Sequence, residues 1–181
     1  MWRKIDNYYP PWLELISVLL LVFAFAYTFS NYELLPESIP THFGLSGHPD
    51  SWSPKGFWSI YMLPVIGTAI CLSMAIMNFF LIIKPADPGK VVNLTKQQKE
   101  KLGPEQLESI RRFTAQGMIM INLTLAALFT VLQYELIKTA LGLQQGLGIS
   151  SHILVGALLI ESIWLTVKTM SMTSTLKKRR R

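Results

Sequence analysis

The sequence contains a single cysteine, Cys71, so no disulfide can form within the chain. It also lacks the Gly-x-Ser-x-Gly motif of serine hydrolases, the glycine-rich loops that bind phosphates or dinucleotides, and the His-Glu-x-x-His pattern of zinc peptidases. These absences remove the enzyme classes that such motifs identify. Cys71 itself lies within a long apolar run, where a cysteine acts as a small packing residue.

Charged residues are almost absent from four long hydrophobic blocks, at about residues 12–30, 57–83, 113–137 and 151–172. Each block approaches or exceeds the ~18 apolar residues that identify a membrane-spanning helix. The sequence therefore predicts an all-α integral membrane protein in which residues 1–181 form one membrane domain with four transmembrane helices. The fourth block is the weakest, because Glu161 and Lys168 each oppose insertion by ~2.5–3.5 kcal/mol.

The first block has a second interpretation, as a secretory signal peptide. Arg3 and Lys4 form a basic start, and Ala24-Phe25-Ala26 has the small-x-small form of a cleavage site. We expect the block to be retained as a span, and the signal peptide stays the alternative.

Lysine and arginine are scarce in two of the segments that join the blocks. Of the 17 Lys and Arg residues, all but Lys55 and Lys138 fall in the N-terminal segment, the 84–112 loop, the end of the fourth block or the 173–181 tail. Because basic residues stay on the cytoplasmic side, we predict that both termini and loop 84–112 are cytoplasmic. Loop 31–56 then faces outward from the cell inner (plasma) membrane. The net charge of +6 reflects this topology and attraction to anionic lipid, and we expect no nucleic-acid binding.

The predicted cytoplasmic loop is broken at Gly103-Pro104, after a polar stretch of helical composition at residues 95–101. Proline is well placed at the first position of a helix, so one helix is predicted to run from Pro104 into the third span. The loop is either a solvated helical hairpin or a docking surface for a cytoplasmic partner.

The outer loop between the first two blocks is rich in proline, glycine and aromatic residues, unlike a flexible linker. Its prolines, Pro36, Pro40, Pro49 and Pro54, restrict the backbone. Gly44 and Gly47 permit tight turns. We predict an ordered first extracytoplasmic loop that caps the outer ends of the helices.

Within this loop, Pro40-Thr41-His42-Phe43, Gly47, Pro49-Asp50 and Lys55 form a PxHFxxxGxPDxxxxK pattern. The pattern resembles the signature of an uncharacterised bacterial membrane domain that also forms the N-terminal part of SdpI-type toxin-immunity and signalling proteins. The resemblance is specific in residues 34–57 and looser over 12–83. The second membrane region of SdpI-type proteins, with its Asn, Arg-Thr-Pro and Trp signature, is not found. The resemblance implies that partner binding involves His42, Phe43, Gly47, Pro49, Asp50 and Lys55.

Titratable residues on the predicted outer side allow two interpretations. In the first, His42 and Asp50 hold the loop in shape, Asp50 pairs with Lys55, and no cofactor or metal is expected. In the second, a zinc-type ion or an acid-base site is formed by His42, His48, Asp50 and His152. Their spacing matches no strong zinc motif.

Two acidic residues accompany the apolar spans. Glu135, at the outer end of the third span, is expected to pair with Lys138 three residues later. Glu161 falls near the bilayer centre, where an ionisable residue is costly and is a functional hypothesis by default. Its expected partners on the third span are Asn122, Thr124 and Gln116. Glu161 is then either a protonated, hydrogen-bonded contact between helices or a group that couples protons or ions, while Lys168 extends toward the cytoplasmic surface.

The leading hypothesis is a non-enzymatic bacterial inner-membrane protein that recognises another membrane protein, or an extracytoplasmic protein or peptide. Its role would be immunity, signalling or that of an accessory subunit in a membrane complex. The alternative is a membrane enzyme or a proton- or ion-coupled protein that uses Glu161 or the group of His42, His48 and Asp50. The lipid bilayer is the other expected partner, and the oligomeric state is left open.

Overall fold

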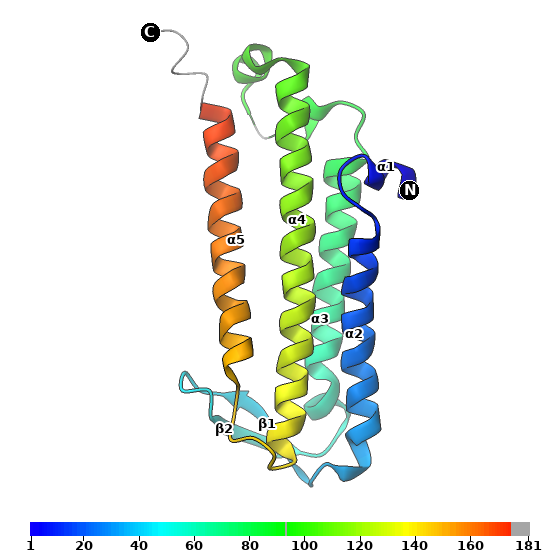
Figure 1. The fold of residues 1–181 in the computed structure, drawn as a ribbon, viewed down its shortest axis with the longest axis vertical. Coiled ribbons are helices and arrows are strands. Elements are labelled where there is room, and N and C mark those ends of the chain that lie inside the picture. The colour runs from blue at the N-terminus through cyan, green and yellow to red at the C-terminus, as the bar shows by residue number, and fades with distance from the viewer. Residues whose placement is uncertain (93, 175–181) are drawn as a thin grey trace.

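The protein is a bundle of four long helices with a β-hairpin at one end, as seen in a computed structural model that describes residues 1–92 and 94–174 (Figure 1). The helices are α1 (Trp2–Asp6), α2 (Trp12–Asn31), α3 (Phe57–Met77), α4 (Lys96–Ala140) and α5 (Ile149–Ser174). Two single 3-10 turns, η1 (Tyr32–Leu34) and η3 (Pro88–Lys90), and the π-helical η2 (Asn78–Ile83) complete the helical segments. The strands β1 (Ser38–Phe43) and β2 (Pro49–Pro54) form the hairpin.

Four segments of the described chain are long and apolar enough to cross a membrane: Trp12–Leu34, Phe57–Ile83, Leu102–Ala140 and Ile149–Thr173. They confirm the predicted all-α fold with four candidate spans. A helix suits a bilayer because it satisfies its own backbone hydrogen-bonding groups, for which the lipid offers no partners.

The long helices alternate in direction, so the segments that join them gather at the two ends of the bundle. Both ends of the described chain and the segment between α3 and α4 lie at one end, and the hairpin lies at the other (Figure 1). We call these the basic end and the hairpin end. Residues 175–181, which include most of the predicted basic tail, lie outside the described residues.

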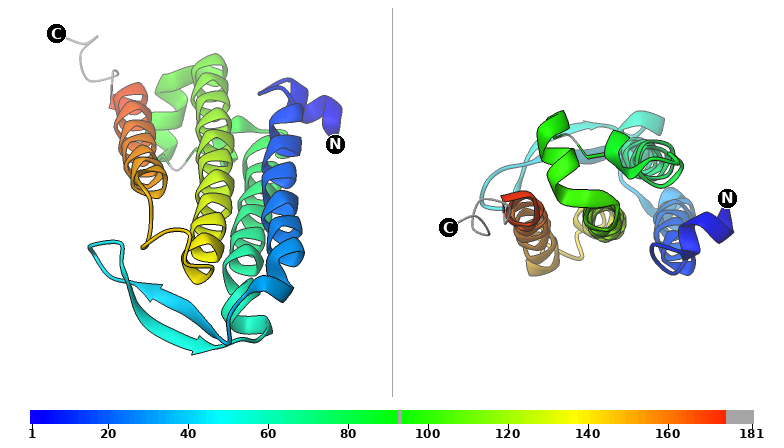
Figure 2. Two further views of the ribbon diagram at one scale, coloured as in Figure 1. Left: turned by 60° about the horizontal axis from the view of Figure 1, so that its bottom comes forward. Right: turned by 90° about the horizontal axis from the view of Figure 1, so that it is seen from above.

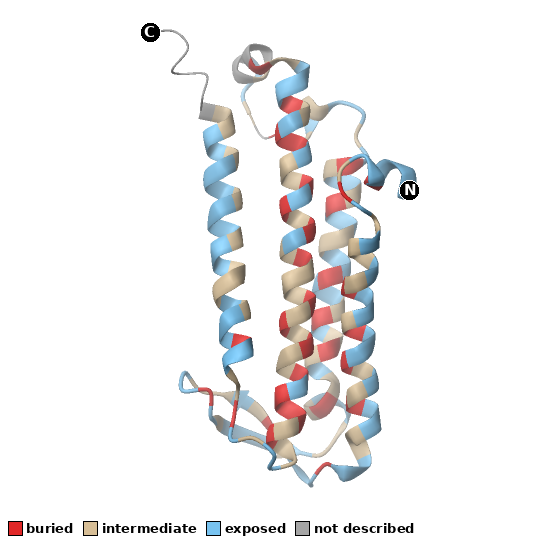
Figure 3. Ribbon diagram, viewed as in Figure 1, coloured by how far each residue is buried: buried red, intermediate tan, exposed pale blue. Residues whose placement is uncertain are grey.

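Helix α4 is the centre of the bundle. It packs against α2, α3 and α5, whereas α5 packs almost entirely against α4 (Figures 1 and 2). Buried residues therefore line α4 and the facing sides of α2 and α3, while most of α5 is exposed in the isolated chain (Figure 3). Exposed apolar side chains on α5, such as Ile160 and Trp164, suit contact with lipid.

Glycines allow two of these helix contacts to be close. A Cβ atom on Gly67 of α3 would lie 2.6 Å from the Phe129 ring of α4. One on Gly117 of α4 would lie 2.3 Å from a Leu165 methyl group of α5. Small residues at such points let helices approach in a membrane, where the hydrophobic effect does not drive helices together.

Buried polar side chains of α4 join it to its neighbours. The Thr130 hydroxyl donates to the Leu20 carbonyl oxygen of α2 at 3.0 Å. The Gln133 amide donates to the Thr28 hydroxyl of α2 at 2.8 Å and to the Ile60 carbonyl oxygen of α3 at 3.0 Å. Such bonds connect membrane helices directly because lipid cannot replace them.

The predicted break in the loop before the third span is present. Gly103 has a φ of 69°, which separates a short helical stretch from the long part of α4 that begins at Pro104. This confirms that one continuous helix runs from Pro104 into the span. The positive φ is easily adopted by glycine because glycine has no Cβ atom.

The predicted outer loop contains the hairpin, whose strands the sequence pattern did not indicate. The strands are antiparallel and pair Ser38 with Pro54 and Pro40 with Trp52, with irregular register near His42. Three prolines in the strands, Pro40, Pro49 and Pro54, obscured this structure because proline is rare inside sheets. In a two-stranded sheet both strands are edges, so a residue whose N–H faces outward can be proline at little cost.

Candidate recognition surface on the hairpin

The base of the hairpin is anchored in the bundle. Ile39 is completely buried and belongs to an apolar cluster with Leu35, Ile60, Leu136 and Ile137. Beside it, the Lys55 ammonium donates to the Leu35 carbonyl oxygen at 3.0 Å and lies 4.8 Å from the centre of the Tyr32 ring. Burial of apolar groups, ~0.8 kcal/mol per CH₂ group, makes this anchor stable.

The tip of the hairpin is a tight turn held against the loop between α4 and α5. Within the turn, the Gly47 N–H donates to the Gly44 carbonyl oxygen at 2.9 Å, and Gly47 has a φ of 79°. The Gly47 carbonyl oxygen accepts from the Leu147 N–H at 2.8 Å, and His48 Nδ1 donates to the Gln145 carbonyl oxygen at 3.1 Å. The hairpin is therefore fixed at both its base and its tip.

His42 and Asp50 form the one ion pair of the hairpin among the described residues. His42 Nδ1 lies 2.5 Å from Asp50 Oδ1, and the two side chains are 67% and 51% exposed. The expected pair of Asp50 with Lys55 is wrong, because Lys55 turns toward the Leu35 carbonyl oxygen at the base. An exposed pair of this kind contributes ~0–1 kcal/mol, so it orients the His42 ring more than it stabilises the fold.

The four side chains of the alternative metal site do not converge on one point. His42 contacts Asp50, His48 contacts the Gln145 carbonyl oxygen, and His152 Nδ1 donates to the Gly148 carbonyl oxygen at 2.8 Å. Among the described side chains, which do not include those at positions 93, 97, 98, 100, 101 and 174–181, no cluster of three or more His, Cys, Asp or Glu has the arrangement of a metal site.

Glu135 is buried beside the same loop and does not pair with Lys138, contrary to the sequence-based expectation. Its side chain faces Gly148, where a Cβ atom would lie 2.7 Å from Glu135 Oε1, and Oε2 has no hydrogen-bond partner. The Lys138 ammonium lies 5.3 Å from the centre of the Tyr134 ring instead. A buried carboxyl at the end of α4 had no signal in the sequence other than its place beside an apolar run.

A cavity of about 220 Å³ lies beneath the hairpin, between α3 and α4. Strand β1 supplies Thr41, His42 and Phe43, and Leu147 from the α4–α5 loop closes one side. The helices supply Ser59, Ile60, Met62, Leu63, Leu132 and Leu136. The wall is mainly apolar, and its polar side chains come only from the hairpin and the first turn of α3.

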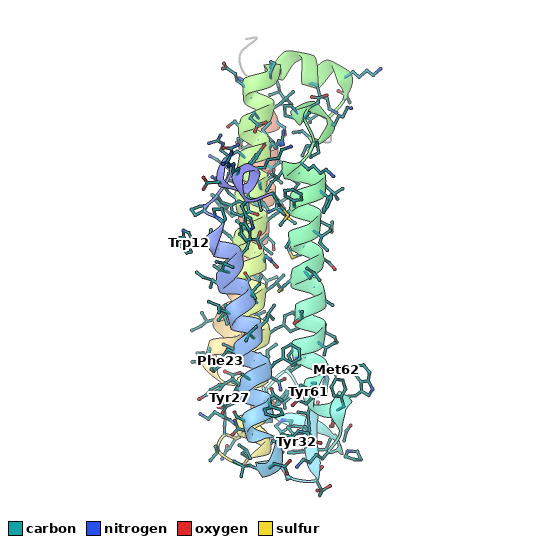
Figure 4. The ribbon with its side chains drawn as sticks, turned by 90° about the vertical axis from the view of Figure 1, so that its right-hand side faces the viewer. Trp12, Phe23, Tyr27, Tyr32, Tyr61 and Met62 are labelled. Carbon is teal, nitrogen blue, oxygen red and sulfur yellow. The ribbon has the colours of Figure 1, made fainter. Side chains whose placement is uncertain are left out.

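Exposed aromatic side chains surround the start of α3 at the hairpin end. The Phe57 ring lies 5.2 Å from the rings of both Trp58 and Tyr61. Tyr61, Met62, Tyr27 and Tyr32 lie toward this end, and Trp12 lies toward the opposite one (Figure 4). Trp and Tyr side chains favour membrane–water interfaces, so these two levels mark where the interfaces are expected.

Glu161 of α5 is held by one of its three expected partners. The Thr124 hydroxyl donates to Glu161 Oε1 at 3.0 Å, and Glu161 Oε2 is inaccessible to solvent and has no hydrogen-bond partner. Asn122 is buried elsewhere, next to Cys71, and Gln116 donates to the Tyr8 carbonyl oxygen. Asn122 is thus not part of the Glu161 site, because it lies on the face of α4 that packs against α3.

A polar cluster at the basic end was missed by the sequence analysis. Buried Asn78 donates to the Tyr9 hydroxyl at 3.1 Å, and that hydroxyl donates to Glu14 at 2.8 Å. Arg111, also buried, donates through Nε to the Ile82 carbonyl oxygen at 2.7 Å and through Nη2 to the Ile83 carbonyl oxygen. Arg111 therefore caps carbonyls left unpaired at the end of η2.

The two tyrosines of this cluster have raised pKa values. Burial is the main cause for both Tyr8 and Tyr9. Hydrogen bonds to carboxylates raise each pKa further, from Tyr8 to Glu108 and from Tyr9 to Glu14. The sequence signals that could have located this cluster were Asn78 inside an uncharged span and Arg111, which follows Pro104 in the long part of α4.

Comparison with known proteins places the hairpin in a wider context. Residues 19–68 match a family model described as a domain of unknown function (DUF1648). These residues cover most of α2, the whole hairpin and the start of α3. The match is consistent with the predicted uncharacterised membrane domain within residues 12–83.

A relative is known from an archaeon. An uncharacterized protein of Archaeoglobus fulgidus is 28% identical over 136 residues, which cover 71% of this chain and 69% of the archaeal protein. No solved structure matches the chain.

Proposed function

We propose that this is a multi-pass plasma-membrane protein that recognises an extracytoplasmic protein or peptide through its hairpin. The observation that carries the proposal is that the hairpin is fixed at its base and at its tip while its outer surface is exposed. The base is anchored by Ile39 and Lys55, and the tip by Gly47. A surface held in one shape binds with a lower entropic cost than a flexible loop.

The exposed surface has the composition of a binding patch. Leu45 at the tip is fully exposed, and the Trp52 side chain on β2 is about half exposed. The His42–Asp50 pair belongs to the same hairpin. Tryptophan is among the residues that most often dominate the binding energy of interfaces, and the ion pair supplies hydrogen-bonding groups of defined orientation.

The proposed orientation places both termini and the basic end in the cytoplasm and the hairpin outside the cell. It rests on the concentration of Lys and Arg at the basic end, of which Arg3, Lys84 and Arg111 are examples. In this orientation, the resemblance of the hairpin sequence to SdpI-type proteins supports a role in immunity, in signalling or as an accessory subunit.

The experiment compares two exposed leucines at the hairpin end. A photo-crosslinking amino acid is placed in living cells at Leu45, on the hairpin, or at Leu143, in the α4–α5 loop. The proposal expects a discrete crosslinked partner from position 45 that is absent from position 143 and is weakened by Asp50→Asn. Equal crosslinking from both positions, or crosslinking that Asp50→Asn leaves unchanged, would contradict recognition by the hairpin.

A second function is favoured by Glu161. Its Oε2 atom is buried without a partner in a segment expected to cross the membrane. Ionisable residues at such positions often carry protons or ions. Proton flux into vesicles that contain the purified protein, abolished by Glu161→Gln and retained in Glu14→Gln, would support this function. No flux above that of protein-free vesicles would exclude it.

A further inference from the structure

The cavity beneath the hairpin changes in polarity along its depth. At the level of the hairpin its lining includes three residues with polar side chains, Thr41, His42 and Ser59. Farther into the bundle its lining is aliphatic, with Met62, Leu63 and Leu132 as the deepest members on α3 and α4. A ligand that matches both parts has one polar end and an apolar remainder.

The deep part of the cavity lies at the level of lipid chains. Met62 is five residues from the start of α3 at Phe57, and Leu132 is eight residues from the end of α4 at Ala140. At 1.5 Å per residue, these positions lie about 8 and 12 Å inside the helix ends. The α3–η2 segment of 27 residues is about 40 Å long, compared with a hydrocarbon core of about 30 Å. In the proposed orientation, on which this inference rests, the deep wall is therefore within the outer half of the hydrocarbon.

The cavity is accessible from the side of the bundle. Met62, one of its walls, is 39% exposed on the surface of α3. Helix α5 packs against α4 and leaves α3 uncovered (Figure 2). An occupant can thus enter from the outer leaflet without crossing the hairpin.

His42 lines the polar end of the cavity and has a second ring nitrogen that the contact with Asp50 does not use. The contact of His42 Nδ1 with Asp50 orients the ring and leaves Nε2 for another group. The Ser59 hydroxyl is already used locally, since it donates to the Pro54 carbonyl oxygen at 2.8 Å and accepts from the Gly56 N–H at 3.0 Å. The Thr41 hydroxyl lies 3.4 Å from the Ser53 hydroxyl, a long contact that leaves Thr41 able to bind a further group. His42 and Thr41 are therefore the groups proposed to bind a polar ligand.

We propose that this cavity is a binding site for an amphiphile of the outer leaflet. The occupant places an acyl or similar aliphatic chain between α3 and α4 and a small headgroup, with a hydroxyl or a carboxylate, against His42 and Thr41. The volume of about 220 Å³ exceeds the ~150 Å³ of an apolar cavity that holds benzene. It therefore accepts several methylene groups, with the rest of the chain extending past Met62 into the lipid.

The test uses the purified full-length protein in vesicles of phosphatidylethanolamine and phosphatidylglycerol. The probe is palmitic acid with a photoactivatable diazirine midway along its chain. If the site exists, labelling of the peptides that contain Met62–Leu63 and Leu132 should saturate. Unlabelled palmitate or hexadecanol should reduce that labelling. Competition by palmitate alone indicates a carboxylate headgroup, and competition by both indicates that a hydroxyl is sufficient.

Cavity-filling variants distinguish the site from the lipid-facing surface. Leu132→Trp on α4 and Met62→Trp on α3 fill the cavity from opposite walls. Each is expected to weaken the apparent affinity for the probe on the order of tenfold, because the added ring displaces about two methylene groups of the chain. Met120→Trp, an exposed position on α4, is the control and is expected to leave labelling unchanged. If Leu132→Trp does not fold, Met62→Trp decides.

Three results would overturn the proposal: labelling that does not saturate, labelling that neither competitor reduces, or labelling that both folded cavity variants retain. Partner recognition by Leu45 can fail while the amphiphile site stands, because the crosslinking and labelling experiments report on different residues.

Discussion

Replacing Gly146 by alanine is expected to release the tip of the hairpin from the α4–α5 loop. A Cβ atom at position 146 would lie 2.3 Å from the Gly47 carbonyl oxygen and 3.0 Å from the Gly47 carbonyl carbon. Both are backbone atoms that cannot rotate away as a side chain can, so the two segments must separate. Separation breaks the hydrogen bonds from Leu147 to Gly47 and from His48 to Gln145.

The size of the effect follows from these two bonds. A hydrogen bond contributes ~0.5–1.5 kcal/mol net, so the pair contributes about 1–3 kcal/mol to docking of the tip. The equilibrium constant for undocking should rise about 5- to 150-fold. The Leu147 amide reports this directly, because its N–H donates to Gly47, and its hydrogen exchange should accelerate by the same factor.

The matched control is Gly156→Ala. Gly156 lies within α5, and an added Cβ atom there would meet nothing within 4 Å. Alanine is favoured over glycine in a helix by about 1 kcal/mol, so Leu147 exchange should stay as in the wild type. If the Leu147 amide exchanged as slowly in Gly146→Ala as in the wild type, the added methyl group would not separate the tip from the α4–α5 loop. That result would contradict the close approach of Gly146 to Gly47.

Three further predictions concern topology and the basic end. Reporter fusions after Gly47 should report the outside and fusions after Lys99 the cytoplasm; the reverse result would invert the proposed orientation. Arg111→Met should lower the free energy of unfolding in detergent by about 1–3 kcal/mol, because two carbonyls of η2 lose their donor, whereas exposed Arg112→Met should change it little. Burial raises the pKa of Tyr9 above its ordinary 10.0. The folded state thus favours the neutral phenol, so the stability that Tyr9 contributes below pH 10 is lost as the pH rises beyond it. The free energy of unfolding should therefore fall less steeply with pH in Tyr9→Phe than in the wild type. Equal slopes would contradict the buried placement of Tyr9.

The four helices could be predicted from the sequence because their cause is local. An apolar run of sufficient length must satisfy its own backbone groups in lipid, and a helix does so without help from distant residues. The start of the third span's helix at Pro104 was predictable for the same reason, since Gly103 and Pro104 act on their own backbone. The one-sided distribution of Lys and Arg likewise needed no tertiary information.

Only the tertiary structure decided which polar groups meet. Asp50 has two candidate partners nearby in sequence, His42 and Lys55. It pairs with His42 because β1 pairs with β2 and because Lys55 is bound to the Leu35 carbonyl oxygen. Glu135 lies against Gly148 rather than Lys138 because the α4–α5 loop folds back onto the end of α4. The cavity depends on α3, α4 and β1 at once. Which of several possible partners a side chain meets depends on how the segments pack together. A local sequence pattern determines the shape of each segment but not its neighbours.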